Sequence, residues 1–174
     1  MKRTPCAIRR AAVSDAAVIA HHRVAMFQDM GQVPTAALAA TLLEASTAAL
    51  ATVLADGSYV GWLAIDAGGQ VVGGAGVHIK PQLPRIALDG AAVVTAPVPL
   101  VVNVYTEPGS RGRGIARALM QALMEWAAAR RFDRVLLHSS VAGRALYVSL
   151  GFVPTNEMRW SPRGNGDPDH SGSG

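Results

Sequence analysis

The sequence Arg-Gly-Arg-Gly-Ile-Ala at residues 111–116 lies between an apolar run and an amphipathic segment, and it limits the possible folds more than any other part of the chain. The β-branched run at 100–106 predicts a strand, and the apolar residues of 114–130 recur at helical spacing. Glycines at such a turn let the backbone approach a ligand, and a helix start offers unpaired N–H groups and a positive dipole end to an anion. We therefore predict that residues 111–116, named the cradle below, hold a phosphate group.

Composition limits the class of protein and the kind of ligand to which the cradle can belong. The 174 residues are half apolar, and no linker interrupts them, which predicts one compact domain. The formal net charge is +4, but the arginines are scattered, so an anionic small ligand accounts for them as well as nucleic acid does. The single cysteine, Cys6, excludes an internal disulfide, and no N-terminal apolar segment resembles a signal peptide or a membrane span. We expect a cytoplasmic protein.

Strand and helix patterns alternate along the chain. Strand patterns occupy residues 7–10, 59–66, 70–79, 100–106 and 134–138, and residues 152–160 give the last strand or strands. Helix patterns occupy 16–29, 35–54, 114–130 and a short segment from Ser139 or Ser140 through Ser149. Residues 80–99 contain four prolines, which predicts an irregular insertion. Residues 1–160 are thus expected to form a single domain, and residues 161–174 a flexible tail.

Spacing separates the nucleotide-binding motifs that could use these glycines. The phosphate-binding loop of nucleotide hydrolases needs Lys and then Ser or Thr after its last glycine, whereas Ile115 follows Gly114. A dinucleotide fingerprint beginning at Gly112 needs a small residue where Arg117 stands, and belongs near the start of a βαβ unit. The pattern that remains is Arg-x-x-Gly-x-Ala, preceded by a strand and followed by a helix.

Two motifs together resemble the GCN5-related N-acetyltransferase (GNAT) family. The family's phosphate motif, Gln/Arg-x-x-Gly-x-Gly/Ala, is matched at Arg111, Gly114 and Ala116. Its later signature, of the type Ala-x-x-Leu-Tyr-x-x-x-Gly-Phe, is nearly matched at 143–152, where Gly143 replaces the alanine. A weaker likeness runs from Ile8 to Trp160 and leaves out the insertion and the tail.

The resemblance implies an α/β fold with a central mixed, mostly antiparallel sheet. This sheet is splayed between its fourth and fifth strands and carries helices on both faces. The resemblance further implies that acetyl-CoA lies in the gap as co-substrate, and no metal is expected. The implied cofactor contacts are on the fourth strand, in the cradle and at the start of the last helix: Val104, Tyr105, Thr106, Arg111, Gly112, Arg113, Gly114, Ile115, Ala116 and Ser140. Ser140 stands where many relatives carry an asparagine, and it either bonds the pantetheine or caps the helix.

The resemblance also implies direct transfer of an acetyl group to a primary amine of a small molecule or peptide. Tyr147 matches the family tyrosine that serves the leaving sulfur as general acid, since a phenol is a donor with a pKa above that of the thiol. Residues 100–106 lack the carboxylate that some relatives use as general base, so Glu107, His78, His138 and a water chain all stay open.

The acceptor is not named by any sequence feature. We expect its pocket around the first two helices and the loop between them, near Phe27, Asp29 and Met30. Neither nucleic acid nor a membrane is expected as a partner, and a homodimer is possible. A second hypothesis also fits the sequence, namely a non-catalytic domain that senses acetyl-CoA or uses this fold for interaction.

Overall fold

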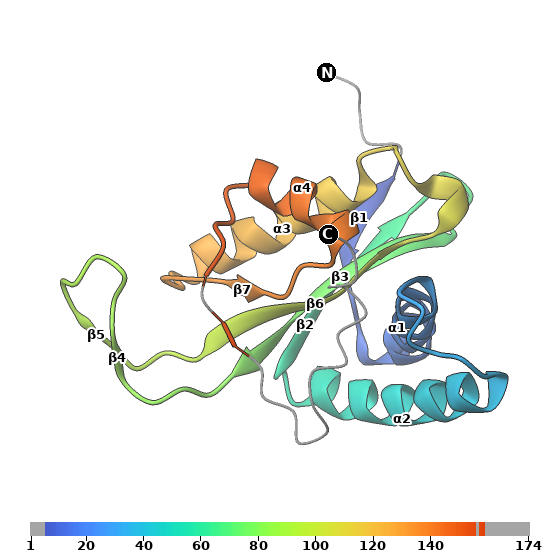
Figure 1. Ribbon diagram of the computed structural model, residues 1–174, viewed down its shortest axis with the longest axis horizontal. Coiled ribbons are helices and arrows are strands. Elements are labelled where there is room, and N and C mark those ends of the chain that lie inside the picture. The colour runs from blue at the N-terminus through green and yellow to red at the C-terminus, as the bar shows by residue number, and fades with distance from the viewer. Residues whose placement is uncertain (1–5, 156, 159–174) are drawn as a thin grey trace, which may run out of the picture.

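The computed structural model describes residues 6–155 and 157–158. Its strands are β1 (Ala7–Arg10), β2 (Tyr59–Ile65), β3 (Val71–Lys80), β4 (Arg85–Ile86), β5 (Val93–Val94), β6 (Val98–Thr106) and β7 (Leu136–Leu137). Its helices are α1 (Ala16–Asp29), α2 (Ala36–Ala55), α3 (Ile115–Ala129) and α4 (Val141–Ser149), with short 3-10 turns η1 (Val13–Asp15) and η2 (Pro108–Ser110). Helices α1 and α2 cover one face of the main sheet, and α3 and α4 lie over the other (Figure 1).

The main sheet has five strands in the order β1-β2-β3-β6-β7. Three of its pairings are antiparallel, and the pairing of β6 with β7 is parallel. This confirms the prediction of a mixed, mostly antiparallel sheet flanked by helices. Strands β6 and β7 are the expected fourth and fifth strands, and they pair only at Leu100↔Leu136 and Val101↔Leu137. From residue 102 onward β6 has no partner on the β7 side within the described residues, so the sheet opens there.

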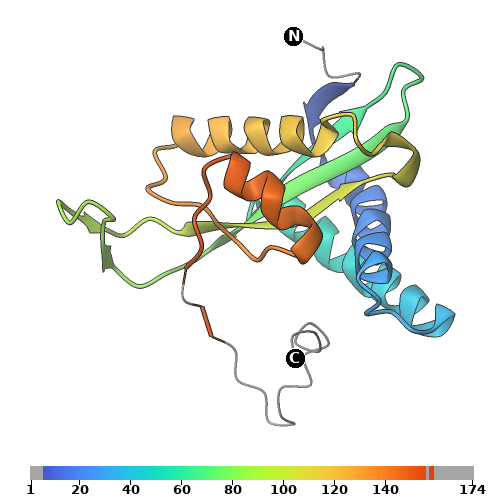
Figure 2. The same cartoon turned by 45° about the horizontal axis from the view of Figure 1, so that its top comes forward.

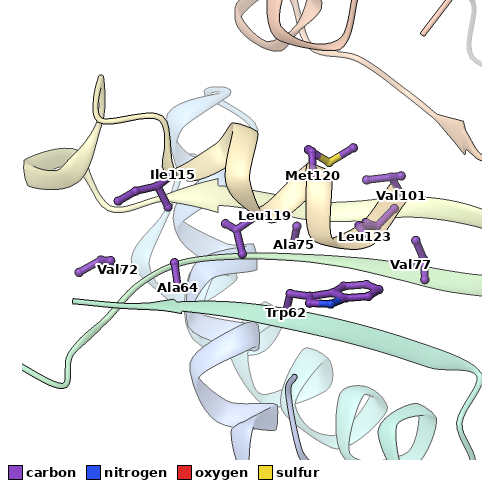
Figure 3. Close-up of a cluster of buried hydrophobic side chains, with 10 residues drawn as sticks. All are labelled: Trp62, Ala64, Val72, Ala75, Val77, Val101, Ile115, Leu119, Met120 and Leu123. Carbon is purple, nitrogen blue, oxygen red and sulfur yellow. The ribbon is translucent and has the colours of Figure 1, made fainter. Parts of the chain in front are cut away.

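The largest cluster of buried side chains lies between α3 and the sheet (Figure 3). Leu119, Met120 and Leu123 of α3 are fully buried, and they lie over Trp62 and Val77 of the central strands. Helix α3 is amphipathic because its apolar residues recur at spacings of three and four. Burial of each such side chain stabilises the fold by about 1.5–3 kcal/mol relative to exposure. This packing fixes the start of α3, and therefore the cradle, against the sheet.

Helix α2 is apolar enough and long enough to cross a membrane by composition and length alone. Its mean hydropathy over an 18-residue window is 1.6, and 11% of that window is buried. In the structure Leu50 is buried in the cluster that α2 shares with α1 and β2, while much of the alanine-rich remainder is exposed. The helix thus belongs to the α1–α2 layer of this domain (Figure 2).

Residues 80–99 are less irregular than predicted. Strand β3 extends to Lys80, β6 already begins at Val98, and between them β4 and β5 form a small antiparallel ribbon. Arg85 at the base of this ribbon forms a two-pronged ion pair with Asp133, with an Nη1–Oδ2 distance of 2.6 Å. This ion pair joins residues 48 positions apart, which no local pattern indicates.

The prediction of a last strand at 152–160 is wrong for the residues that can be tested. Residues 152–155 and 157–158 form no strand. Pro154 offers a physical reason, because proline cannot donate to a strand ladder and is excluded from strand interiors. Residues 156 and 159–160 and the predicted tail at 161–174 lie outside the described residues.

Candidate active site

The cradle adopts a backbone conformation that its glycines permit. Gly112 has φ of 74° and Gly114 has φ of 79°, both in the left-handed region that costs other residues about 1–2 kcal/mol. Gly114 is the N-cap of α3, which begins at Ile115. A Cβ atom added at either glycine would meet nothing within 4 Å, so the space in front of the backbone is open.

The amides of the cradle are free to bind an anion. Among the described residues, no backbone carbonyl accepts a hydrogen bond from the amides of residues 112–117, and Gly114 supplies no side-chain cap. The N-terminal end of α3 adds about half a positive charge from its aligned peptide dipoles. Several unpaired N–H groups beside open space suit the pyrophosphate of a nucleotide cofactor.

Two of the three arginine side chains of this region have structural partners. Arg111 donates from Nε to the Thr106 carbonyl at 3.0 Å, pairs with Asp29 of α1, and lies over the Tyr105 ring. Asp29 raises the pKa of Arg111, so its charge is held at every relevant pH. Arg117 donates to Ser149 Oγ at 2.6 Å and links α3 to α4, whereas Arg113 is exposed. The Arg111 side chain therefore holds the cradle loop against α1 instead of extending toward its open side.

Strand β6 carries a bulge where it separates from β7. Gly74 pairs with Tyr105 and Gly76 with Val102, so Asn103 and Val104 together face the single residue Ala75. Asn103 has φ of 58°, a conformation that asparagine tolerates better than most residues. Val102 packs with the α1–α2 cluster and Val104 with the α3 cluster. The unpaired edge of β6 thus runs from this bulge to the cradle.

The three predicted contacts on β6 differ in their surroundings. Val104 packs toward the α3 face, and Tyr105 is buried with its ring 5.1 Å from that of His22 in α1. The Thr106 Oγ1 atom is buried and has no hydrogen-bond partner within the described part of the chain. A buried hydroxyl without a partner costs about 1–3 kcal/mol, so a ligand that bonds it along this edge would remove that cost.

Helix α4 carries the two remaining predicted residues. Ser140 is its N-cap, and Ser140 Oγ accepts from the Gly143 amide at 3.2 Å, which confirms the capping alternative and leaves a cofactor contact untested. Tyr147 is half-buried against the α3 cluster, and its ring packs edge to face with Phe152. A phenol is protonated at neutral pH and can donate, and burial raises the pKa of Tyr147 further.

The comparisons with known proteins agree with this geometry. The model of the acetyltransferase (GNAT) family matches residues 22–152, which include β6, the cradle and α4. The chain belongs to the GNAT family.

Solved structures support the same assignment. A GCN5-related N-acetyltransferase from Ralstonia eutropha is 30% identical, with 91% of this chain and 99% of that one covered and a TM-score of 0.79. A predicted acetyltransferase from Clostridium acetobutylicum, solved with acetyl-CoA, is 26% identical, with coverages of 90% and 95% and a TM-score of 0.74. Glucosamine-6-phosphate N-acetyltransferase from Arabidopsis thaliana is 16% identical over 90% of this chain and 97% of that one, and its TM-score of 0.63 shows the shared fold. A search of curated proteins finds no match.

In this GNAT domain the candidate bases lie in separate places. Glu107 follows β6, and its Oε1 lies 3.3 Å from Nε2 of His22, a buried residue of α1 that the sequence reasoning missed. His78 is on β3, opposite Leu100 and therefore beyond the bulge from the cradle. His138 is exposed and pairs with Glu157 at 2.8 Å. Desolvation lowers the pKa of His22, which makes it a neutral partner for Glu107. These contacts do not identify Glu107, His78 or His138 as the general base.

A cavity of about 630 Å³ lies beside the GNAT motifs. Its walls are the C-terminal half of α3, β7, α4 and the segment after α4, and both Tyr147 and the candidate base His138 line it. None of the cradle residues and none of the predicted β6 contacts belongs to its lining. The cavity therefore adjoins Tyr147 without being the phosphate seat.

The α1–α2 face of the bulge holds a polar group that sequence reasoning also missed. Asn103 is buried, and its Oδ1 accepts from Arg23 Nη1 at 2.6 Å. Its Nδ2 donates to the Tyr59 hydroxyl at 3.4 Å, and burial raises the pKa of Tyr59 to about 12. The one available signal was Asn103 itself, a single amide within an otherwise apolar run.

Proposed function

We propose that this protein is an acetyl-CoA-dependent N-acetyltransferase that acts on a primary amine of a small molecule or peptide. The observation that carries the proposal is the continuous unpaired surface formed by the β6 edge and the cradle. One end presents free amides at the start of α3, and the other is the bulge at Asn103. An unpaired strand edge with an anion site at one end suits a pantetheine arm joined to a pyrophosphate. The Clostridium acetobutylicum protein solved with acetyl-CoA supports this choice.

Each part of the chain has a role in this reaction. Bound acetyl-CoA supplies an acetyl group activated as a thioester. The cradle amides bind the pyrophosphate, and the orphaned Thr106 hydroxyl bonds the arm that lies along β6. Tyr147, whose phenol is protonated at neutral pH, donates its proton to the sulfur that leaves. Holding the amine and the thioester together turns a bimolecular reaction into a local one, which supplies much of the rate enhancement.

The proton that the amine loses has no assigned acceptor, and a water chain is the proposed route. Strand β6 carries no carboxylate, and Glu107 is held beside His22. A water chain needs no residue of perturbed pKa. It also predicts that the rate rises with pH as more of the acceptor amine becomes neutral.

The test combines binding with turnover. Calorimetry measures the affinity for acetyl-CoA, and release of free thiol measures acetyl transfer to a broad panel of amines, in wild type and in Tyr147→Phe. We expect wild type to bind acetyl-CoA and to acetylate at least one amine, and Tyr147→Phe to bind but react slowly. Tight binding without transfer to any amine would support the sensing domain instead. If acetyl-CoA did not bind, both functions would be excluded.

A further inference from the structure

Arg23 of α1 is a half-buried cation without a carboxylate partner among the described residues. Three other arginines of the chain are paired with carboxylates: Arg9 with Asp15, Arg85 with Asp133 and Arg111 with Asp29. Arg23 instead donates one hydrogen bond to Asn103 and lies with Cζ 4.8 Å from the centre of the Phe27 ring. Desolvation lowers its pKa, which means that its charge is held at a cost in this environment.

A guanidinium group has five N–H donors in a planar fork. The single bond from Nη1 to Asn103 leaves the other donors without a partner among the residues that the structure describes. Asn103 and the Phe27 ring fix the orientation of the group, so its fork does not have to be ordered when a ligand binds. A fixed, partly desolvated fork binds a carboxylate or phosphate more strongly than a mobile arginine on the surface.

The position of Arg23 relates it to the reaction. The side chains of Asn103 and Val104 leave the bulge on opposite faces of the sheet, with Asn103 toward α1 and Val104 toward the α3 cluster that includes Tyr147. If the sulfur lies on the Tyr147 side, the amine reaches the thioester from the α1 side. Arg23 then stands beside the path of the acceptor, next to the Phe27 region where the acceptor pocket is predicted.

We propose that Arg23 binds an oxyanion of the acceptor, so that the preferred substrate is a small amine that also carries a carboxylate or a phosphate. This inference rests on the proposed function, because it assigns a substrate class to the same site. An amine without such a group would leave the Arg23 charge uncompensated in a partly desolvated position. The protein would then discriminate in two ways: an anionic acceptor gains a bond to Arg23, and a neutral acceptor leaves the Arg23 charge without a partner.

The test uses pairs of acceptors that differ mainly in the anionic group. Suitable pairs are γ-aminobutyrate and its amide, alanine and alaninamide, and phosphoethanolamine and ethanolamine, which separate carboxylate from phosphate recognition. The variants are Arg23→Met, which keeps the packing on Phe27, and Arg23→Lys, which keeps the charge. Arg130→Met is the matched control, since Arg130 lies over the Trp126 ring on α3, on the other face of the sheet.

We expect wild type to favour the anionic member of at least one pair through a lower KM. In Arg23→Met that preference should fall by about 10- to 100-fold, the range for a lost charge-assisted hydrogen bond. Arg23→Lys should retain part of it, and Arg130→Met all of it. An equal loss for both members of each pair would mean that Arg23 only positions Asn103, and would overturn the proposal.

When turnover is too slow to measure, binding measurements test the inference on Arg23 separately from the proposed acetyl-CoA-dependent function. The anionic compounds are titrated into the protein saturated with CoA, and binding that Arg23→Met weakens about ten-fold or more supports the inference. If the protein binds CoA but none of the anionic compounds, the inference on Arg23 fails while the cofactor site stands. If wild type does not bind acetyl-CoA at all, the proposed function fails first. Thermal unfolding of each variant checks that the fold is kept.

Discussion

Replacing Gly114 by alanine separates the conformational role of this residue from its role in ligand approach. Its φ of 79° lies in the left-handed region, and no atom lies within 4 Å of an added Cβ. The new methyl group therefore clashes with nothing in the free protein, and the cost to folding is torsional. That cost is about 1–2 kcal/mol, offset in part by about 0.4–1 kcal/mol from the less flexible unfolded chain.

Gly57 provides a matched control far from the cradle. It follows α2 with φ of 78°, and an added Cβ would likewise meet nothing within 4 Å. Gly57→Ala and Gly114→Ala should lose the same stability, on the order of 1 kcal/mol, which corresponds to a fall in Tm of about 2–4 °C for a chain of this size. Urea unfolding and thermal scans measure both values.

Ligand affinity should distinguish the two variants. In Gly114→Ala the methyl group enters the space in front of the free amides and prevents close approach of the pyrophosphate. Losing one charge-assisted hydrogen bond of about 1.5–3 kcal/mol weakens binding by roughly 10- to 100-fold. Gly57→Ala should bind acetyl-CoA with the wild-type Kd in calorimetry. Wild-type affinity in Gly114→Ala, or an equal loss in both variants, would refute the assignment of the cradle as phosphate seat.

Three further outcomes follow from individual contacts. Tyr147→Phe should lower kcat by about 100-fold, which is the lower end of the range for a lost general acid, and should leave the calorimetric Kd for acetyl-CoA unchanged. A parallel loss of affinity would contradict a purely catalytic role. Gly76→Ala should destabilise the fold by about 1–3 kcal/mol in urea unfolding, because an added Cβ would overlap the Tyr59 hydroxyl. The control Gly68→Ala lies in the β2–β3 turn and should be tolerated, because the atom nearest to its added Cβ is 3.4 Å away. Arg85 lowers the pKa of Asp133 to about 2 from 3.8, so this carboxylate stabilises the fold above about pH 4 and loses that contribution as the pH falls through 2. The difference in stability between wild type and Arg85→Gln should accordingly be smaller at pH 2 than at pH 6, and a constant difference between the two proteins would exclude this linkage.

The parts of the fold that depend on local sequence were predictable. Helix α1 has the predicted bounds, and the cradle and Ser140 cap lie where their residue types placed them. In each case the determining interactions span a few residues: a capping hydroxyl, a left-handed glycine or an apolar stripe. The family motifs are equally local, so the sequence alone could name the residues that are proposed to bind the cofactor.

The parts that depend on distant contacts were not. The β4–β5 ribbon is tied to Asp133 across 48 residues, and Glu107 meets His22 across the α1–β6 interface. His22 follows Ile19 by three residues on the buried stripe of α1, a position that an apolar residue usually takes. Sequence periodicity could identify that stripe, but it could not indicate which strand the stripe would meet.

The bulge on β6 explains why the proposed acceptor side was the hardest part to predict. In a regular strand, successive side chains alternate between the two faces, so Val102 and Asn103 would point to opposite sides. The structure places both toward the α1–α2 layer, because one extra residue is inserted opposite Ala75. This insertion brings an amide to a face that would otherwise be apolar and lets it hold Arg23, 80 residues earlier in the chain. In the proposed function, the same strand presents its free edge to acetyl-CoA and a polar group to the acceptor. A single polar residue in an apolar strand is therefore the feature from which a search for the acceptor site in such a sequence should begin.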